Sequence, residues 1–403
     1  MFTEKYQNND LSIISQFNGG IGVEWSIAAG EAVDDIVTTY NNTKSIKMTS
    51  TNAANARIDK VVSLNVALKP NIELWYYCDH KENLDGHLKI YLQTKSSWSH
   101  LQYIDIIVSS CLGIGWQKIK FNLNEYGCYA NTGTPDFTDV TTIRIAFKSK
   151  AGTTVNVWLQ HLSISSNKLK KGIIILTWDG LWKQFYTLGF PKMKSLGFHG
   201  TCFQTISWIT SNPNHASYLT LSMLYNLQNS RFDIASHTQN HLDYSAVSLA
   251  DAINDVYQGY YYLTIRRFKA ARLMAWPYGI HPQTVEESIT KYCDFARSTD
   301  RFMFERAPFS NPYALRCRGF DNTLTLVNAK LFVDNAVSTK AVFILFGHKL
   351  GSVADSLTWT TSDFNDLMDY IKTKVDSGLL LVQSLSEYLN CIGQNKQTFY
   401  KIT

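Results

Sequence analysis

The fold of the second half of the chain is decided by residues 231–241, which read Arg231-Phe-Asp-Ile-Ala-Ser236-His237-Thr-Gln-Asn-His241. The residues up to Ser236 predict a short buried strand, and the first histidine follows it directly. Histidines spaced four apart share one face of a helical turn, so His237 and His241 are candidates to bind one metal ion together. Solvent-facing histidines of a helix are the alternative interpretation.

The sequence on both sides of this stretch alternates between strands and helices. Predicted strands cover residues 172–178, 231–236, 273–276, 341–347 and 379–383, and predicted helices cover about 183–196, 220–229, 248–268 and 362–375. Ser248 and Asp251 form a capping box at the start of the third helix. This alternation predicts an α/β barrel with parallel strands, in which functional residues lie at the carboxyl ends of the strands.

Three further strand ends carry candidate functional groups. Thr177-Trp178-Asp179 ends the first strand, Pro277-Tyr278-Gly279 follows the third, and His348 follows the fourth. If the barrel closes, these groups and the histidine pair converge on one mouth.

These four segments resemble the motifs of the polysaccharide deacetylase (NodB-homology) family, also known as carbohydrate esterase family 4. Residues 177–181 read Thr-Trp-Asp-Gly-Leu where the family has Thr-Phe-Asp-Asp-Gly, and residues 237–241 match His-(Ser/Thr)-x-x-His. Residues 275–278 read Ala-Trp-Pro-Tyr against Arg-x-Pro-Tyr, and residues 345–348 match Leu-x-x-His. The resemblance covers roughly residues 172–390 and implies a distorted (β/α) barrel over residues 172–403.

The resemblance implies a metal-dependent deacetylase that hydrolyses N- or O-acetyl groups of a cell-surface or capsular polysaccharide. In such a site His237, His241 and an aspartate hold a divalent metal, for which we expect zinc. Asp179 acts as general base, the backbone N–H of Tyr278 stabilises the oxyanion, and His348 protonates the leaving group. A buried structural histidine is the alternative for His348.

The first motif departs from the family because it holds one aspartate where the family has two. In the ungapped register Asp179 is the base and Gly180 replaces the metal-binding aspartate. In a register slipped by one residue, Asp179 is the metal ligand and Trp178 replaces the base. We favour the ungapped register, in which Gly180→Asp is expected to tighten metal binding.

The third motif departs from the family because Ala275 stands where the family has an arginine that pairs with the base. We therefore expect Asp179 to lack an ionic partner, which puts the activity in question. Trp276, Pro277 and Trp182 are candidate substrate-binding residues that would line a sugar groove, although aromatic residues of this kind also occur in cores.

Residues 1–166 read as a series of short strands and predict an all-β sandwich or jelly roll. The predicted strands cover residues 72–77, 88–93, 103–108, 116–123, 142–147 and 154–159. This half loosely resembles a jelly-roll carbohydrate-binding module, with Trp75, Tyr76, Trp98 and Tyr103 as candidate platform residues. A structural or oligomerising sandwich is the alternative, and a short basic linker at residues 167–171 separates the two halves.

Composition narrows the classes of function. The 403 residues carry a net charge of only +5 and no dense basic stripe, so we expect no nucleic-acid partner. No apolar run is long enough to insert into a membrane, and residues 1–10 are too polar for a secretory signal peptide. The seven cysteines are scattered, which argues against disulfides or a zinc–thiolate site and predicts buried thiols.

Three functions follow from these observations. The first is the deacetylase with a β-sandwich accessory domain and a polysaccharide substrate. The second is a catalytically silent glycan-binding protein, favoured by Gly180 and Ala275. The third is a structural component of a virion, such as a phage tail, or of a surface appendage. We expect an extracellular or virion-associated location and assembly into a homo-oligomer or a virion.

Overall fold

The computed structural model describes residues 11–391, except residues 41, 96, 107–110, 126–128, 168, 181, 211–216, 301–303, 308 and 310. The chain divides into two compact units, one of Met1–Lys168 with Phe309–Asn311 and one of Leu169–Pro308 with Pro312–Thr403. Within the described residues, no helix has the length and apolar character that a membrane span requires.

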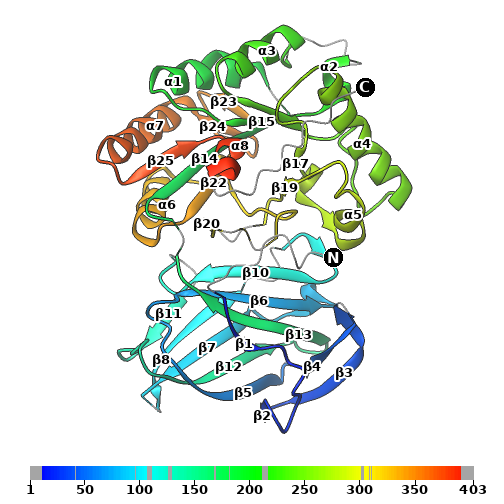
Figure 1. Cartoon of the computed structure of the whole chain (residues 1–403), viewed down its shortest axis with the longest axis vertical. Coiled ribbons are helices and arrows are strands. Elements are labelled where there is room, and N and C mark those ends of the chain that lie inside the picture. Colours follow the sequence, from blue (N-terminus) through cyan, green and yellow to red (C-terminus); the bar gives the residue numbers. More distant parts are fainter. Residues whose placement is uncertain are drawn as a thin grey trace. The chain divides into compact units, whose positions relative to one another are not determined.

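The first unit contains two antiparallel sheets, drawn in blue to green in Figure 1. One has the strand order β10-β6-β13-β4-β3, with β1 paired to β13, and the other has the order β11-β8-β7-β12-β5-β2. The elements of this unit are β1 (Ser12–Ser15), β2 (Ser26–Ala29), β3 (Glu31–Tyr40), β4 (Thr43–Thr51), β5 (Asn55–Leu64), β6 (Asn71–Cys78), η1 (Lys81–Asn83), β7 (Leu88–Thr94), β8 (Ser97–Ile106), β9 (Gly113–Ile114), β10 (Gln117–Asn122), β11 (Tyr129–Thr132), β12 (Val140–Lys148) and β13 (Thr154–Ser165).

Alternation along the strands separates a core face from an outer face in this unit. In β6, Leu74 and Tyr76 are buried in the core, whereas Trp75 and Tyr77 lie on the opposite face. Tyr76 is therefore not a platform residue, because its ring is buried. The predicted β-rich character is confirmed, the jelly-roll topology stays a prediction, and residues 107 and 108 of one predicted strand lie outside the described residues.

The outer face of this sheet gathers a group of rings. Tyr40, Trp116 and Trp158 are buried there, with Trp75 and Tyr77 packed against them. Their ring faces are turned mainly toward one another, with the Tyr40 and Trp75 centroids 4.2 Å apart and those of Tyr77 and Trp158 5.1 Å apart. Trp75 and Tyr77 are the half-buried members of this cluster, so the surface that it offers to a sugar is confined to these two rings.

The second unit is built on a nine-stranded sheet with the strand order β19-β17-β16-β15-β14-β22-β20, to which β21 and β25 add through β22 and β14. All pairs are parallel except β20 with β22. The strands are β14 (Gly172–Asp179), β15 (Thr201–Gln204), β16 (Asp233–Ser236), β17 (Leu273–Ala275), β18 (His281–Pro282), β19 (Phe295–Arg297), β20 (Phe304–Glu305), β21 (Arg318–Gly319), β22 (Val342–Gly347), β23 (Lys349–Gly351), β24 (Thr358–Thr360) and β25 (Leu380–Gln383).

Helices flank this sheet, as the green to red part of Figure 1 shows. They are η3 (Phe185–Gly189), α1 (Phe190–Ser195), α2 (Ile206–Thr210), α3 (Leu221–Asn229), α4 (Leu249–Ile265), η4 (Pro277–Gly279), α5 (Gln283–Ser288), α6 (Leu326–Thr339), α7 (Thr361–Asp376) and α8 (Leu385–Cys391). The predicted cap is present, because the hydroxyl of Ser248 accepts a hydrogen bond from the backbone N–H of Asp251 at 3.2 Å. Strand β15 and helix α6 were not predicted, and closure of the sheet into a barrel stays a prediction.

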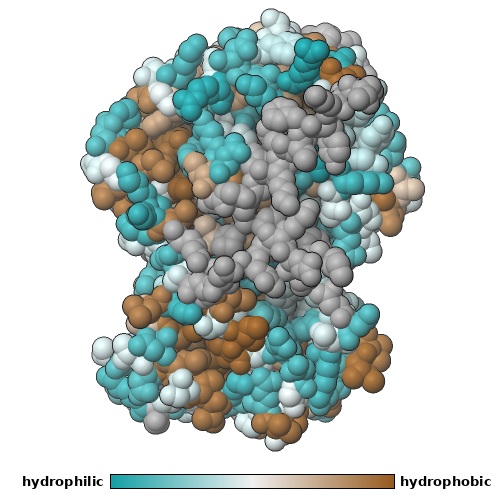
Figure 2. Space-filling model, in the orientation of Figure 1, coloured by the Kyte–Doolittle hydropathy of each residue, from teal (hydrophilic) through white to brown (hydrophobic). Residues whose placement is uncertain are grey.

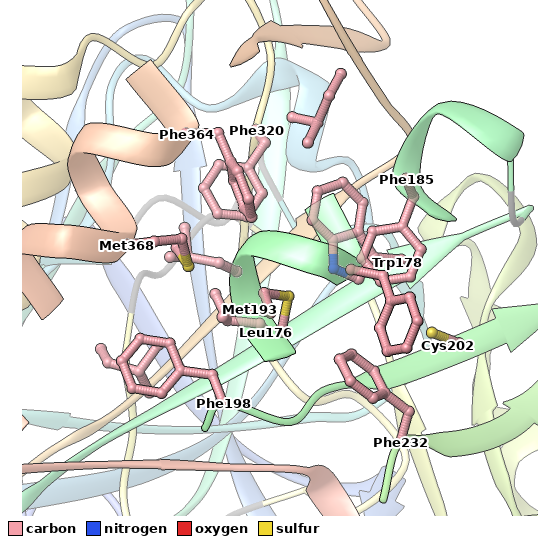
Figure 3. Packing of buried hydrophobic residues seen from close by; sticks show 14 of the residues in the cluster. Leu176, Trp178, Phe185, Met193, Phe198, Cys202, Phe232, Phe320, Phe364 and Met368 are labelled. Carbon is pink, nitrogen blue, oxygen red and sulfur yellow. The ribbon is translucent and has the colours of Figure 1, made fainter. Parts of the chain in front are cut away.

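The core of the second unit packs the helices onto one face of the sheet. Figure 3 shows Trp178 of β14 among Phe185, Phe320 and Phe364, and the centroid of the Trp178 ring lies 4.4 Å from that of Phe185. Trp178 is fully buried. Because neighbouring residues of a strand point to opposite faces, Asp179 is directed away from this aromatic core.

The cysteines mostly behave as the sequence predicts. All six that the structure describes are free thiols. Cys111, Cys202, Cys293 and Cys317 are buried, but Cys78 is half-buried and Cys391 is exposed. Cys128 lies outside the described residues.

Candidate active site

Asp179 stands at the carboxyl end of β14 and is almost fully buried. One carboxylate oxygen, Oδ2, accepts a hydrogen bond from Nη2 of Arg297 in a buried ion pair. The other oxygen, Oδ1, has no hydrogen-bond partner among the described residues. A buried carboxylate oxygen without a partner is costly, so this atom is available for a ligand, a water or a proton.

Arg297 corrects the expectation that Asp179 lacks an ionic partner. Arg297 ends β19, which pairs with β17 so that Arg297 lies directly beside Ala275. The cation that the family places at the position of Ala275 is therefore supplied by the neighbouring strand. The guanidinium is held over the ring of Phe346, 4.7 Å from its centroid, and its Nη1 donates to the carbonyl of Ser298 at 3.2 Å.

His237 and His241 come together, but not on a helical turn. The segment after β16 is a loop in which Thr238 and His241 adopt left-handed backbone angles, with φ of 67° and 58°. The two rings nevertheless lie 4.6 Å apart between centroids. The helical basis of the sequence prediction is wrong, whereas the pairing of the two rings is present.

Helix α4 shapes this loop. Oδ1 of Asp255 accepts a hydrogen bond from the backbone N–H of Asn240 at 2.7 Å, and its Oδ2 accepts one from the hydroxyl of Tyr244 at 3.0 Å. A Cβ at Gly259 would lie 2.5 Å from Oγ of Ser236, so only glycine lets the helix approach the loop this closely. Two residues one turn apart on α4 thus fix the backbone of the histidine loop.

The imidazole of His237 is oriented for ligand binding through one nitrogen. Its Nδ1 lies 2.9 Å from the carbonyl oxygen of Ala275 and must donate the proton there, which leaves the Nε2 lone pair free. Burial lowers the pKa of His237 to about 3, although Asp179 opposes this shift. The ring is therefore neutral at physiological pH, as a metal ligand must be.

Burial and neighbouring charges shift the pKa values of the other titratable groups of the site. Burial lowers the pKa of His348 and of His241, while the charge of Asp179 opposes both shifts. Burial alone would raise the pKa of Asp179, but the charge of Arg297, with His237 and His348, holds it below its ordinary value. The structure thus brings together the aspartate and the three histidines predicted from the strand ends.

Tyr278 joins this group through its ring, which lies 4.6 Å from that of His241 between centroids and is 59% exposed. Its backbone has φ of 56°, which is uncommon for a residue with a side chain. Trp276 is corrected as a candidate substrate-binding residue because only 1% of it is exposed and its indole N–H donates to the carbonyl of Tyr313 at 2.6 Å. Pro277 is also buried and offers no surface to a sugar.

Gly180 is confined by an aromatic neighbour. It has φ of 67°, and a Cβ at this position would lie 2.5 Å from Cζ3 of Trp208. An aspartate would therefore be strained by its backbone and would collide with the indole. Gly180→Asp is not the simple restoration of a metal ligand that the sequence suggests, because Trp208 occupies the space of that side chain.

Asp300 and Asp321 are two carboxylates of this unit that are directed away from His348. Oδ2 of Asp300 lies 3.0 Å from Nε2 of His281, and Oδ1 of Asp321 accepts a hydrogen bond from the backbone of Thr323 at 2.8 Å.

Sequence reasoning missed Arg297, Trp208 and Asp255. The signal for Arg297 was weak but present: an arginine ends the apolar segment Phe295-Ala296-Arg297, one strand after the motif that lacks it. Trp208 and Asp255 lie outside every motif, and only the fold brings them to the site.

Residues 166–294 match the model of the family described as polysaccharide deacetylase. A comparison with curated proteins found no match.

Several solved structures are similar to this chain at low identity. One is the Xyl-CE4 domain of a multidomain xylanase from the hindgut metagenome of Trinervitermes trinervoides, with 15% identity, 58% of this chain and 96% of that chain covered, and a TM-score of 0.39. Another is peptidoglycan deacetylase PdaC from Bacillus subtilis, with 14% identity, coverage of 56% and 93%, and a TM-score of 0.36. A third is a family 4 carbohydrate esterase from Streptomyces lividans in complex with acetate, with 13% identity, coverage of 52% and 90%, and a TM-score of 0.34.

Proposed function

We propose that this chain deacetylates polysaccharides by metal-assisted hydrolysis at Asp179, His237, His241 and His348. The match of residues 166–294 to the polysaccharide deacetylase family supports a hydrolase of this class. The observation that carries the proposal is the buried Asp179–Arg297 pair with its free carboxylate oxygen beside three imidazoles with lowered pKa. The substrate we propose is an acetylated polysaccharide of a cell surface or capsule.

The residues present fit a divalent metal. His237 and His241 would hold it, because both are neutral imidazoles and His237 has a free Nε2. Zinc is the metal we propose, since imidazole nitrogens suit it. Bound there, it would polarise the attacking water and the acyl carbonyl.

Asp179 is proposed as the general base rather than as a metal ligand. Three observations support the ungapped register: Trp178 fills the aromatic core, Asp179 points away from it, and Oδ2 of Asp179 is already engaged by Arg297. The depressed pKa of Asp179 keeps it ionised at neutral pH, so Oδ1 can accept a proton from water.

The proposed reaction uses two proton transfers. Asp179 accepts a proton as the water oxygen forms a bond to the acetyl carbonyl carbon, and the backbone N–H of Tyr278 donates to the oxyanion. His348 donates a proton to the leaving nitrogen or oxygen as its bond to the carbonyl carbon breaks. The products are acetate and a free amine or hydroxyl group on the glycan.

The test measures acetate released from N-acetylated and O-acetylated polysaccharides by the full chain with added zinc, cobalt or nickel. We expect Asp179→Asn to reduce the turnover at least about a hundredfold, the contribution of a general base. Acetate release that is unchanged in Asp179→Asn would refute the mechanism.

A second candidate function is a silent glycan-binding protein. The space of a third metal-ligand side chain at Gly180 is taken by Trp208, and this favours a recognition groove over a catalytic centre. A native chain that binds the acetylated polymer but releases no acetate with any of the three metals would establish this candidate.

For the β-rich first unit we propose assembly, with polysaccharide binding as the alternative. Exposed aliphatic residues on two edge strands support assembly, whereas most of the outer-face rings are closed against one another. The partner we propose is a second copy of the chain, and virion assembly through the same edges is the other form of this proposal. An extracellular or virion-associated location follows from the proposed substrate.

A further inference from the structure

Three half-buried aromatic side chains form a wall that begins at His241. The indole of Trp208, in α2, stacks on the imidazole of His241 with the ring centroids 5.7 Å apart. The ring of Tyr218 lies 4.8 Å from that of Trp208 and 4.6 Å from that of Trp182, and the two indoles are 6.3 Å apart, all between centroids. We call Trp182, Trp208 and Tyr218 the aromatic wall.

Lys349 follows His348 directly in the sequence and lies over the Trp182 member of the aromatic wall. Its Nζ lies 3.9 Å from the ring centroid of Trp182. In the described part of the chain this ammonium has neither a hydrogen-bond acceptor nor a carboxylate within 4.0 Å. Asp355 senses the charge of Lys349 but directs its carboxylate to the backbone of Leu357, at 2.7 Å.

Other lysines of this unit are paired differently. Lys192 contacts Asp369 at 2.6 Å, and Lys374 contacts Asp334 at 2.6 Å. Lys349 instead has only a ring beneath it. A half-buried ammonium on an indole is partly desolvated, so an incoming anion would gain more from it than from a lysine in bulk water.

The aromatic wall and Lys349 offer complementary contacts to one kind of ligand. The apolar faces of sugar rings pack on aromatic side chains, and an ammonium binds a carboxylate, sulfate or phosphate as a compact point charge. Trp208 of the wall stacks on the proposed metal ligand His241, so a sugar bound on the wall neighbours the sugar that is deacetylated.

We propose that the aromatic wall and Lys349 form a subsite for a negatively charged sugar next to the acetylated one, so that the substrate is an acidic acetylated polysaccharide. This inference rests on the proposed function, whose site lies beside the wall. Trp208 then has two effects: it builds the subsite and it occupies the space of a side chain at Gly180.

The test compares two polymers that differ only in charge. One alternates N-acetylhexosamine with a uronate, and the other is the same polymer with its carboxylates reduced to alcohols. Binding to the full chain is followed by tryptophan fluorescence and calorimetry, and acetate release is measured separately. We expect the charged polymer to bind about tenfold more tightly at low salt, the gain of one charge-assisted contact, with the difference shrinking as salt is added.

Lys349→Gln should abolish this preference, and Lys349→Arg should keep most of it. Lys330→Gln is the matched control, because Lys330 also lies over a ring, 5.4 Å from the centroid of Tyr370, on α6. This control should bind both polymers as the native chain does. Sulfated and phosphorylated polymers, tested in parallel, identify which anion is preferred.

Equal binding of both polymers by the native chain, or binding of neither, would overturn the inference. So would a Lys349→Gln variant that shifts only the pH profile while treating both polymers alike, because Lys349 would then act on His348. Acetate release from the reduced polymer without charge preference leaves the proposed function intact, whereas charge-dependent binding without acetate release refutes that function alone.

Discussion

Arg297 supplies the cation beside Asp179 that the third motif lacks because it has Ala275. Burial of a lone carboxylate would raise its pKa and neutralise it, so a base in this position requires a cation beside it. Because Ala275 and Arg297 are partners in the parallel register of β17 and β19, the cation comes from the strand adjacent to the third motif. Breaking such a buried pair costs about 3–5 kcal/mol, since it leaves an uncompensated buried charge.

Arg297→Ala is expected to reduce turnover by about two orders of magnitude, because Asp179 loses the charge that keeps it ionised. The pKa of Asp179 is held low by Arg297, so its removal should move the acid limb of the pH–rate profile to higher pH. Steady-state kinetics between pH 4 and 9 check both effects, with melting temperature measured alongside.

A double variant, Ala275→Arg with Arg297→Ala, provides the control for Arg297. If the charge beside Asp179 is what matters, returning the arginine to the neighbouring strand should recover part of the activity and move the acid limb back. Recovery of folding without any movement of that limb would indicate that Arg297 is structural only.

His348, the proposed proton donor, is expected to set the alkaline side of the same profile. As a proton donor it must be protonated, and burial lowers its pKa below the ordinary value of 6.5. Activity should therefore fall as the pH rises through the lowered pKa, which places the descending limb below pH 6.5. A limb that stays in place in His348→Gln would show that another group donates the proton.

Helix α4 positions the loop that carries the proposed metal ligands His237 and His241. The carboxylate of Asp255 and the absent side chain of Gly259 act on the same loop, one by hydrogen bonds and the other by close approach. Partners behind metal ligands of this kind typically affect metal affinity by about 10–100-fold.

Asp255→Ala is expected to weaken zinc binding by about 10–100-fold, because the backbone of Asn240 and the hydroxyl of Tyr244 lose their acceptor. Zinc titration by calorimetry on the full chain measures this effect. Asp251→Ala is the matched control on the same helix: it loses only the carboxylate oxygen that accepts a hydrogen bond from the Ser248 hydroxyl at 2.6 Å, worth about 1 kcal/mol of stability. It keeps the backbone N–H that the Ser248 cap uses and should bind zinc normally. Equal loss of zinc affinity in both variants would contradict the positioning role.

The strand ends could be predicted from the sequence, whereas the loop conformation and the pairing of strands could not. The strand ends at Asp179, His237 and His348 were predictable, because a parallel sheet carries its functional residues at one edge. The conformation of the histidine loop was not, since left-handed angles at Thr238 and His241 leave no periodic signal. Arg297 depends on the register between two strands, which no single segment encodes.

The first unit leaves apolar residues exposed along the edges of its sheets. Val33, Ile36 and Val37 on β3 are exposed, with Ile36 at 81% and Val37 at 87%, and Ile27 on β2 is exposed as well. Brown surface covers the positions of β3 and β2 in Figure 2. Both strands end their sheets, and exposed apolar edge strands invite pairing with another chain.

We therefore expect the chain to self-associate through β3. The native chain should elute and scatter light as an oligomer at micromolar concentration, and Ile36→Lys with Val37→Lys should shift it toward the monomer, since a charge on an edge opposes pairing. Val327→Lys is the matched control, because Val327 is 75% exposed on α6 of the other unit. The two edge substitutions should leave acetate release from a soluble polymer unchanged. A native chain that is monomeric at all concentrations would remove this role, and the β-rich unit would then be tested on acetylated glycans through Trp75 and Tyr77, the two rings of the outer-face cluster that are only half-buried.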